Sequence, residues 1–386
     1  AHRTLECFAE LLDMQIELNE FISRSGEAFS FDDAIAFVRN GDVLEIEMRD
    51  SAHRDRWMSG NRKEELLHLY WMNRAVVAFV CYVAEKPERY FMGKPKNQES
   101  NRWAYMLALH TQLRAREVYG IADEMTLNSG QSVNLFQAFL SLNLMAVFFR
   151  DAFLRPFVML KEELGNSIDA MRALGVRGLL EGMQIRWPIT WSGRAEKVAN
   201  LTGWTVSESC PDGSARMAEA ILDFWTYDCV EIARSLKNVE PGLLPEFYER
   251  PVLKFGSMFV QLPWVTGLQH TGNAAINNLR RLGARRAAVG EETRRIESNV
   301  AVALNARGFR TIVGWIPDAQ AGFQTAGEVD VIAVGEGACI VMEVKSTFVR
   351  NSQKEAWLHE TTSLRKAGQQ LQRKLDAVQW AMKNDA

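Results

Sequence analysis

Residues 327–347, GEVDVIAVGEGACIVMEVKST, decide the fold of the C-terminal part of the chain. Two apolar runs flank a Gly-Glu-Gly centre, and such runs bounded by glycine are typical of strands joined in a hairpin. If Glu336 and Gly337 form a two-residue loop, the register pairs Gly335 with Ala338. Further along the same register, Asp330 lies opposite Glu343, with Cβ atoms about 4.5–5.5 Å apart.

Lys345 lies two residues beyond Glu343, so we expect it on the same face of the strand, opposite Glu328. Two carboxylates facing each other on apolar strands repel and are costly to desolvate. A divalent cation removes this conflict, and Mg²⁺ binds through one or two carboxylates while keeping waters for a phosphate substrate. The lysine then orients or deprotonates a water, or stabilises developing charge. The alternative is a surface hairpin with cross-strand ion pairs.

The elements around this hairpin follow a simple order. Two helices are expected over residues 271–309, with a break near Gly290. Three strand-like runs follow, at 309–316, 328–335 and 338–347, and a helix is expected over about 360–382. The C-terminal third of the chain is therefore predicted to be helix, three strands and helix.

This order, with Asp330 on one strand and Glu343-Val344-Lys345 on the next, resembles the PD-(D/E)XK nuclease superfamily, which has the restriction-endonuclease-like fold. The resemblance covers residues 290–386 and implies an α/β core of a helix, three mixed or antiparallel strands and a helix. It also implies a Mg²⁺-dependent phosphodiester hydrolase, in which Mn²⁺ substitutes. Asp330 and Glu343 would be metal ligands, the main-chain carbonyl of Val344 a further ligand, and Lys345 the group that orients the nucleophilic water.

Two more residues fit the resemblance. Glu297, in RRIESNVAVALNARGF (294–309), resembles the acidic residue that many members carry on the leading helix near the metal; the alternative is a solvated charge. Gln370, in KAGQQLQRKL (366–375), resembles a glutamine near the metal or the substrate backbone; the alternatives are an ordinary polar boundary residue, or Gln369 in its place. Side chains at helical spacing form a polar edge on this last helix: Lys366, Gln370, Arg373 and Lys374.

Arginine is concentrated beside the same motif. The arginines of this segment outnumber its acidic residues, which are Glu291, Glu292 and Glu297. The arginines are Arg280, Arg281, Arg285, Arg286, Arg294, Arg295, Arg307 and Arg310. Arginine binds phosphate in a bidentate manner, so this segment is suited to nucleic acid. The predicted nucleic-acid contacts are Arg285, Arg286, Arg294, Arg295, Lys366 and Arg373. A solvated face with internal salt bridges is the alternative.

The sequence departs from the superfamily in two ways. Val329, rather than proline, precedes Asp330. The family core also has a strand after the second helix, whereas this sequence ends at Ala386. Either the core is trimmed, or the sequence is a fragment that stops there, or residues 252–262, VLKFGSMFVQL, supply the strand.

The first 240 residues are expected to form a large all-α domain. Apolar residues at helical spacing predict helices over 3–24, 61–86, 101–118, 132–163, 167–183 and 215–236. Asn61 with Glu64 and, separately, Ser214 predict helix starts, Gly165 predicts a helix end, and Pro156 predicts a kink or break. Residues 241–289 are predicted to be a linker with short strands and an Arg-rich helix, and 290–386 the nuclease-like domain.

Composition places the chain among ordinary globular proteins, because 47% of its 386 residues are hydrophobic and 24% are charged. The net charge of −3 means that any nucleic-acid contact needs a local basic patch. Five scattered cysteines indicate a reducing compartment, and residues 133–149 are expected to be a buried core helix. The sequence starts at Ala1 without a visible signal peptide, as expected of a processed chain or a fragment. The expectation is a cytoplasmic protein with no membrane partner.

These observations predict a Mg²⁺-dependent nuclease, acting on DNA as an endonuclease, as in a restriction or phage-defence effector. The helical region would supply target recognition, regulation, a protein interface or a homo-oligomer contact. Two alternatives remain open. One is a catalytically silent nuclease-fold module for nucleic-acid binding or scaffolding, and the other is cleavage of RNA or single strands.

Overall fold

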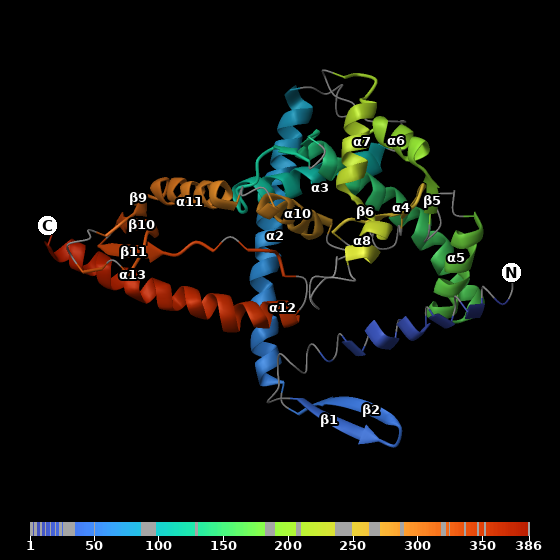
Figure 1. Ribbon diagram of the computed structural model, residues 1–386, viewed down its shortest axis with the longest axis horizontal. Coiled ribbons are helices and arrows are strands. Elements are labelled where there is room, and N and C mark those ends of the chain that lie inside the picture. The colour runs from blue at the N-terminus through green and yellow to red at the C-terminus, as the bar shows by residue number, and fades with distance from the viewer. Residues whose placement is uncertain are drawn as a thin grey trace. The chain divides into compact units, whose positions relative to one another are not determined.

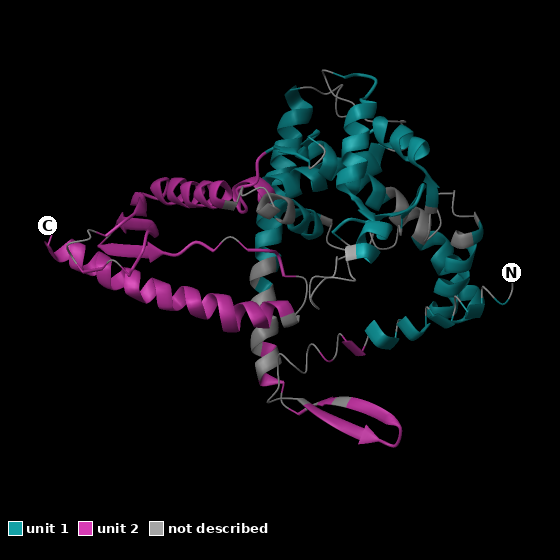
Figure 2. Cartoon of the chain, in the orientation of Figure 1, with its two compact units in different colours: residues 1–19, 62–113, 123–282 teal, residues 20–61, 114–122, 283–386 magenta. Residues whose placement is uncertain are grey.

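The protein is mixed α/β and mostly helical (Figure 1). The computed structural model describes scattered residues between 3 and 25, and then residues 35–49, 51–85, 98–127, 130–181, 190–205, 210–235, 249–261, 271–285, 289–317, 322–323, 325–335, 337–345, 347–350 and 353–384. Figure 2 shows the two compact units of the chain. Unit 1 comprises residues 1–19, 62–113 and 123–282, and unit 2 comprises residues 20–61, 114–122 and 283–386.

The predicted three-stranded sheet forms in unit 2. Its strands are β9 (Arg310–Trp315), β10 (Val329–Gly335) and β11 (Ala338–Met342), all antiparallel, with β10 in the centre. Gly335 pairs with Ala338 and Val331 pairs with Met342, which confirms the predicted register. Gly337 has a φ of +76°, which costs glycine no steric strain in a tight loop; Glu336 lies outside the described residues.

Helices flank this sheet. The contacts with β9 and β10 come from α11 (Val289–Asn305), and those with β11 come from α13 (Arg365–Asn384), which follows α12 (Gln353–Leu358) and the π-helical segment η4 (His359–Leu364). Neighbouring residues on β10, such as Val331 and Ile332, are both buried, as expected when both faces of a strand are covered. Val329 and Ile332 pack with Val378 of α13.

A hairpin lies where the sequence analysis expected only helices. Strands β1 (Ile35–Asn40) and β2 (Val43–Met48) pair in an antiparallel manner around a Gly41-Asp42 loop. Gly41 has a φ of +62°, and a two-residue Gly-Asp loop between strand-like runs is a hairpin signal. The prediction of an all-α region over residues 1–240 is therefore wrong, because the strand pattern around Gly41-Asp42 outweighs the helical pattern on either side.

Unit 1 is built from helices and two further small sheets. The helices that lie wholly or mostly in it are α2 (Ala52–Glu85), α3 (Gln98–Glu117), α4 (Leu135–Leu164), α5 (Ser167–Glu181), α6 (Arg194–Thr202), α7 (Ala215–Phe224), α8 (Cys229–Ser235) and α10 (Thr271–Arg285). One sheet pairs β3 (Glu124–Thr126) with β4 (Ser132–Asn134). The other has the order β5 (Thr190–Gly193), β8 (Met258–Gln261), β7 (Val252–Phe255) and β6 (Thr226–Asp228).

The segment 252–262 does form a hairpin, β7–β8, but it does not extend the sheet of unit 2. Its outer partners are β5 and β6, both in unit 1. Val252 and Phe259 are buried there, so the apolar face of the hairpin packs in unit 1. The possibility that this segment supplies a fourth strand to β9–β11 is therefore excluded.

Some predicted helix boundaries hold and others do not. The Ser214 side chain accepts a hydrogen bond from the Met217 N–H at 3.2 Å and caps α7, while Gly165, with a φ of +79°, ends α4. Asn61 lies inside α2, so the predicted start there is wrong. The helix α4 continues through Pro156, because flanking residues such as Phe157 and Leu160 pack against α5 and hold the segment.

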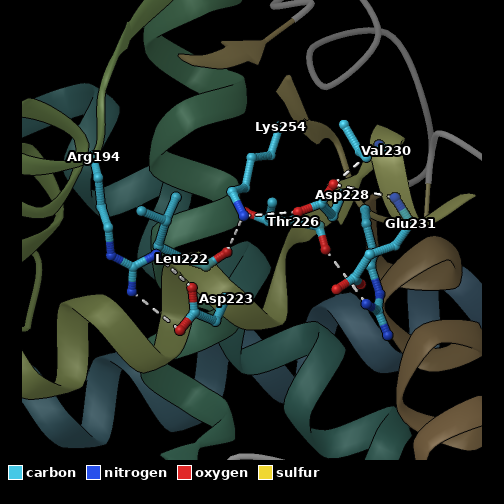
Figure 3. Close-up of polar contacts among 9 residues, drawn as sticks. Arg194, Leu222, Asp223, Thr226, Asp228, Val230, Glu231 and Lys254 are labelled. Carbon is cyan, nitrogen blue, oxygen red and sulfur yellow. Dashed lines mark hydrogen bonds and ion pairs between the residues drawn. The ribbon is translucent and has the colours of Figure 1, made fainter. Parts of the chain in front are cut away.

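Figure 3 shows the polar contacts around β6 and β7. Asp228 faces Lys254 in the parallel register, and the Lys254 Nζ donates to the Asp228 Oδ2 at 2.7 Å. This hydrogen bond is the main reason that the pKa of Asp228 lies below its usual range. The other oxygen of Asp228 accepts from the N–H groups of Val230 and Glu231, at 3.0 and 3.3 Å, and so caps α8.

One stretch of α2, Glu65–Glu85, is long and apolar enough to cross a membrane, and 6% of it is buried. A single stretch of this kind is weak evidence for a membrane protein. The shorter apolar stretch Leu135–Val147 is a core helix as predicted, with side chains such as Phe139 and Leu142 buried. A cytoplasmic location stays a prediction.

Candidate active site

Asp330 and Glu343 meet around a lysine that belongs to the last helix. Asp330 lies on β10, and Glu343 follows β11, one step beyond the paired residues Val331 and Met342. The Lys374 Nζ donates a hydrogen bond to the Asp330 Oδ1 at 3.0 Å and another to the Glu343 Oε2. An ammonium therefore lies between the two carboxylates.

The main chain holds Asp330 from the other side. The Val344 N–H donates to the Asp330 Oδ2 at 2.6 Å. This N–H is free for a side chain because β11 ends at Met342 and the chain beyond it leaves the ladder. Both oxygens of Asp330 thus have a donor, and the carboxylate is fixed beside the Glu343-Val344-Lys345 segment.

Lys345 contacts Glu343 rather than Glu328. Its Nζ donates to the Glu343 Oε1, and its side chain is 37% exposed. The expected pairing of Lys345 with Glu328 is wrong, because it assumed that the ladder continues past Met342. Lys345 is nevertheless the most exposed charged group at the acid pair, where an amine can meet a substrate or a water.

The two lysines keep Glu343 ionised. Burial by itself would raise the pKa of Glu343, but hydrogen bonds from Lys345 and Lys374, and the charges of these lysines, lower it below its ordinary value. Burial by itself would lower the pKa of Lys374, but hydrogen bonds to Glu343 and Asp330 raise it. At neutral pH the site therefore combines a carboxylate at Glu343 with an ammonium at Lys374.

Glu297 of α11 is the third acidic residue that the sequence analysis placed here. It is 8% exposed, so the alternative of a solvated charge on the helix face is wrong. Its pKa is raised, first by burial and then by the negative charges of Asp330 and Glu328. This coupling shows that Glu297 lies within the electrostatic reach of Asp330.

The donor set fits a magnesium ion. Asp330 and Glu343 supply the one or two carboxylates that protein-bound Mg²⁺ uses, and they already hold a cation between them. A divalent charge would also relieve the repulsion that raises the pKa of Glu297. Within the described part of the chain, no three His, Cys, Asp or Glu side chains converge on one metal position. Waters and the Val344 carbonyl, whose role stays a prediction, would have to complete the coordination.

Gln370 lies on the same face of α13 as Lys374. Residues four apart are neighbours on a helix surface, so Gln370 precedes Lys374 by one turn on the side that meets the acid pair. Gln370 is half-buried and Gln369 is exposed. The helix phase therefore favours Gln370, and its contact with a metal or substrate stays a prediction.

The basic residues predicted to bind nucleic acid divide into several groups. Arg294, Lys366 and Arg373 are exposed, and the Arg373 Nε also donates to the Gln369 carbonyl oxygen at 3.4 Å. Arg295 donates to the Gly120 carbonyl oxygen and lies 3.6 Å from the Glu291 carboxylate, which matches the structural alternative of internal ion pairs. Arg286 and the Arg285 side chain lie outside the described residues.

Lys374 is the site residue that sequence reasoning missed. The sequence analysis placed it on the polar edge of its helix and assigned it no role in the site. A signal was available, because Leu371, Lys374 and Val378 share one helical stripe, and a lysine within an apolar stripe needs a buried partner.

Comparisons of the chain with protein-family models, with curated proteins and with solved structures give no match. The function of the protein is therefore argued from the geometry and chemistry of the acid pair and its lysines.

Proposed function

We propose that unit 2 is a Mg²⁺-dependent nuclease of the PD-(D/E)XK type, which hydrolyses phosphodiester bonds, with DNA as the substrate. One observation carries the proposal. Two carboxylates, Asp330 on β10 and Glu343 just after β11, converge on the ammonium of Lys374, beside the exposed amine of Lys345.

The residues divide the work of hydrolysis between them. Asp330 and Glu343 would hold the metal ion, which when bound would supply Lewis acidity and lower the pKa of a coordinated water. Lys345 orients the attacking water and stabilises negative charge on the phosphate oxygens. Attack of the water oxygen on phosphorus forms one P–O bond while the bond from phosphorus to the 3′ oxygen breaks. The water loses a proton to solvent and the departing 3′ oxygen takes one up, which leaves a 5′-phosphate and a 3′-hydroxyl.

Exposed cations on the helices that flank the sheet are suited to hold the substrate. Arg294, Lys366 and Arg373 are exposed and lie on the two helices that flank the sheet. Such groups bind the phosphate backbone regardless of sequence. We propose that the remainder of the chain supplies target recognition, a protein interface or a homo-oligomer contact, as in a cytoplasmic restriction or phage-defence effector.

The test is cleavage of plasmid DNA, single-stranded DNA and RNA with Mg²⁺ or EDTA. Wild-type protein should cleave DNA only with Mg²⁺, and Mn²⁺ should substitute. Asp330→Ala and Lys345→Ala should each lower the cleavage rate by about 100-fold or more. Lys383→Ala changes an exposed lysine at the far end of α13 and should cleave at the wild-type rate. Full activity in both site variants, with thermal melts that show folded protein, would contradict the proposal.

A second candidate is a nucleic-acid-binding module without catalysis. It is favoured by Lys374, because an ammonium between the carboxylates satisfies the acid pair without a metal. This module would bind DNA in a salt-dependent manner and would bind neither Mn²⁺ nor Mg²⁺ at millimolar concentrations. Metal titration of the wild-type chain therefore separates the two candidates.

A further inference from the structure

Lys374 occupies the place between the acid pair that a metal ion would take. Its side chain is 6% exposed, and those of Asp330 and Glu343 are 14% and 6% exposed. Burial of an ammonium is costly unless its charge is compensated, and here two carboxylates provide the compensation. The contact therefore follows from the packing of α13 on the sheet, where the neighbouring Ala377 and Val378 are also buried.

The remaining oxygens of the acid pair are engaged as well. The Asp330 Oδ2 accepts from the Val344 N–H, and the Glu343 Oε1 accepts from Lys345. The oxygens that face each other across the site, Asp330 Oδ1 and Glu343 Oε2, are those bound by Lys374. A divalent ion at about 2.0–2.1 Å from these two oxygens would coincide with the ammonium and repel it.

We infer that Lys374 competes with the metal ion for the acid pair. Its ammonium binds both carboxylates in the metal-free protein and must leave them before a divalent ion binds. This inference rests on the proposed function of Asp330 and Glu343 as metal ligands. Lys374 is thus a positioning residue. Its ammonium keeps two like charges together, at the cost of a lower metal affinity.

Two effects follow from this competition. Without Lys374, a metal ion no longer has to displace an ammonium, so the metal affinity rises. Without Lys374 and without metal, the two carboxylates face each other uncompensated, so the apo protein becomes less stable. A lysine with a purely structural role would produce the second effect and not the first.

The experiment measures Mn²⁺ binding to the full chain by titration calorimetry and by the EPR signal of free Mn²⁺. Lys374→Met keeps the length of the side chain and removes its charge, and Lys374→Gln is a second variant that tolerates polar surroundings. Lys383→Met, on the exposed end of the same helix, is the control. We expect both Lys374 variants to bind Mn²⁺ at least about tenfold more tightly than wild type. Their apo melting temperatures should fall and should recover with Mn²⁺.

A second measurement needs no variant. An amine-reactive acetylating reagent should modify Lys374 slowly in the metal-free wild-type protein, because the amine is buried and ion-paired. Saturating Mn²⁺ should raise the modification rate of Lys374, measured by mass spectrometry, and leave the rate of Lys383 unchanged. An unchanged Lys374 rate at saturating Mn²⁺ would overturn the inference.

The outcomes separate this inference from the proposed function. If the Lys374 variants bind Mn²⁺ no more tightly than the wild type, and the wild type shows metal-dependent cleavage, the competitor role of Lys374 is overturned. The proposed nuclease function is then unaffected. No Mn²⁺ binding by wild type or by any variant overturns both. If the Lys374 variants bind Mn²⁺ more tightly but the wild type does not cleave DNA, the competition by Lys374 is supported and the proposed nuclease function is contradicted.

Discussion

Two buried lysines have different partners, and the partner decides how readily each amine keeps its proton. Lys374 lies between two carboxylates, and its pKa is raised despite burial. Lys197 of α6 is 8% exposed and donates to the amide oxygen of Gln261, a neutral partner. Burial therefore lowers the pKa of Lys197 to about 8. A carboxylate compensates the desolvation of an ammonium, whereas an amide does not.

The lowered pKa of Lys197 predicts a pH-dependent stability. The folded protein releases this proton near pH 8, and the unfolded chain releases it near the ordinary value of 10.5. Because the unfolded chain binds more protons between these values, the free energy of unfolding rises with pH there. Urea denaturation of wild type and Lys197→Met near pH 7 and near pH 10 should show the wild type gaining stability relative to the variant. A difference that is the same at both pH values would contradict this account.

At the scale of elements, short contacts explain how strands and helices join. Gly120 follows α3 with a φ of +62°, and a Cβ there would meet the main-chain oxygen of Glu292 on α11. The Asn299 Nδ2 of α11 donates to the Glu117 carbonyl oxygen at 3.1 Å. The end of α3 and the helix that carries Glu297 are thus held together within unit 2 by a close backbone approach that only glycine permits.

The joint between β6, β7 and α8 allows a sharp test of capping. Asp228→Ala removes both the cap of α8 and the pair with Lys254, and we expect a loss of about 1 kcal/mol in the free energy of unfolding. Lys254→Met removes only the half-buried ion pair, keeps the cap of α8, and should cost less.

The stabilisation by Asp228 depends on pH in the acidic range. Because the folded pKa of Asp228 is lowered, its stabilisation is present above the unfolded pKa, near 3.8, and is lost as pH falls through the folded value. The difference between wild type and Asp228→Ala, followed by circular dichroism during acid titration, should therefore shrink at low pH. A difference that persists in strong acid would show that the carboxylate charge is not the cause.

For the whole molecule, each unit buries its own apolar residues. Unit 1 encloses side chains such as Phe139, Phe224 and Trp225, and unit 2 encloses Val329 and Ile332. The predicted boundary of the nuclease-like domain at residue 290 falls close to residue 283, where the last segment of unit 2 begins. A ligand bound in one unit should therefore stabilise mainly that unit.

Hydrogen exchange of the full chain tests this expectation. Saturating Mn²⁺ should slow amide exchange in β10, β11 and α13, which carry the acid pair and Lys374, and leave exchange in α4 and α7 unchanged. Asp330→Asn removes the charge of one proposed metal ligand and should abolish the slowing of amide exchange by Mn²⁺ in unit 2. Equal protection in both units would contradict independent stabilisation.

Local features could be predicted from the sequence of this protein without its fold. A two-residue loop sets the register of a hairpin, so the approach of Asp330 to Glu343, one step beyond the paired Val331 and Met342, followed from the residues between them. The Ser214 cap and the Gly165 helix end are equally local. The β1–β2 hairpin could also have been predicted from its Gly41-Asp42 loop, although the helical pattern on either side obscured it.

Tertiary structure alone decided which distant segments meet. The sheet partners of β7–β8 depend on β5 and β6, and Lys374 reaches the acid pair because α13 packs on β11 and turns that lysine inward. Such contacts join residues far apart in the chain, and their stability comes from burial and charge compensation between elements, which no local pattern encodes. The sequence by itself thus determined the acid pair, and the fold decided which cation lies between its members.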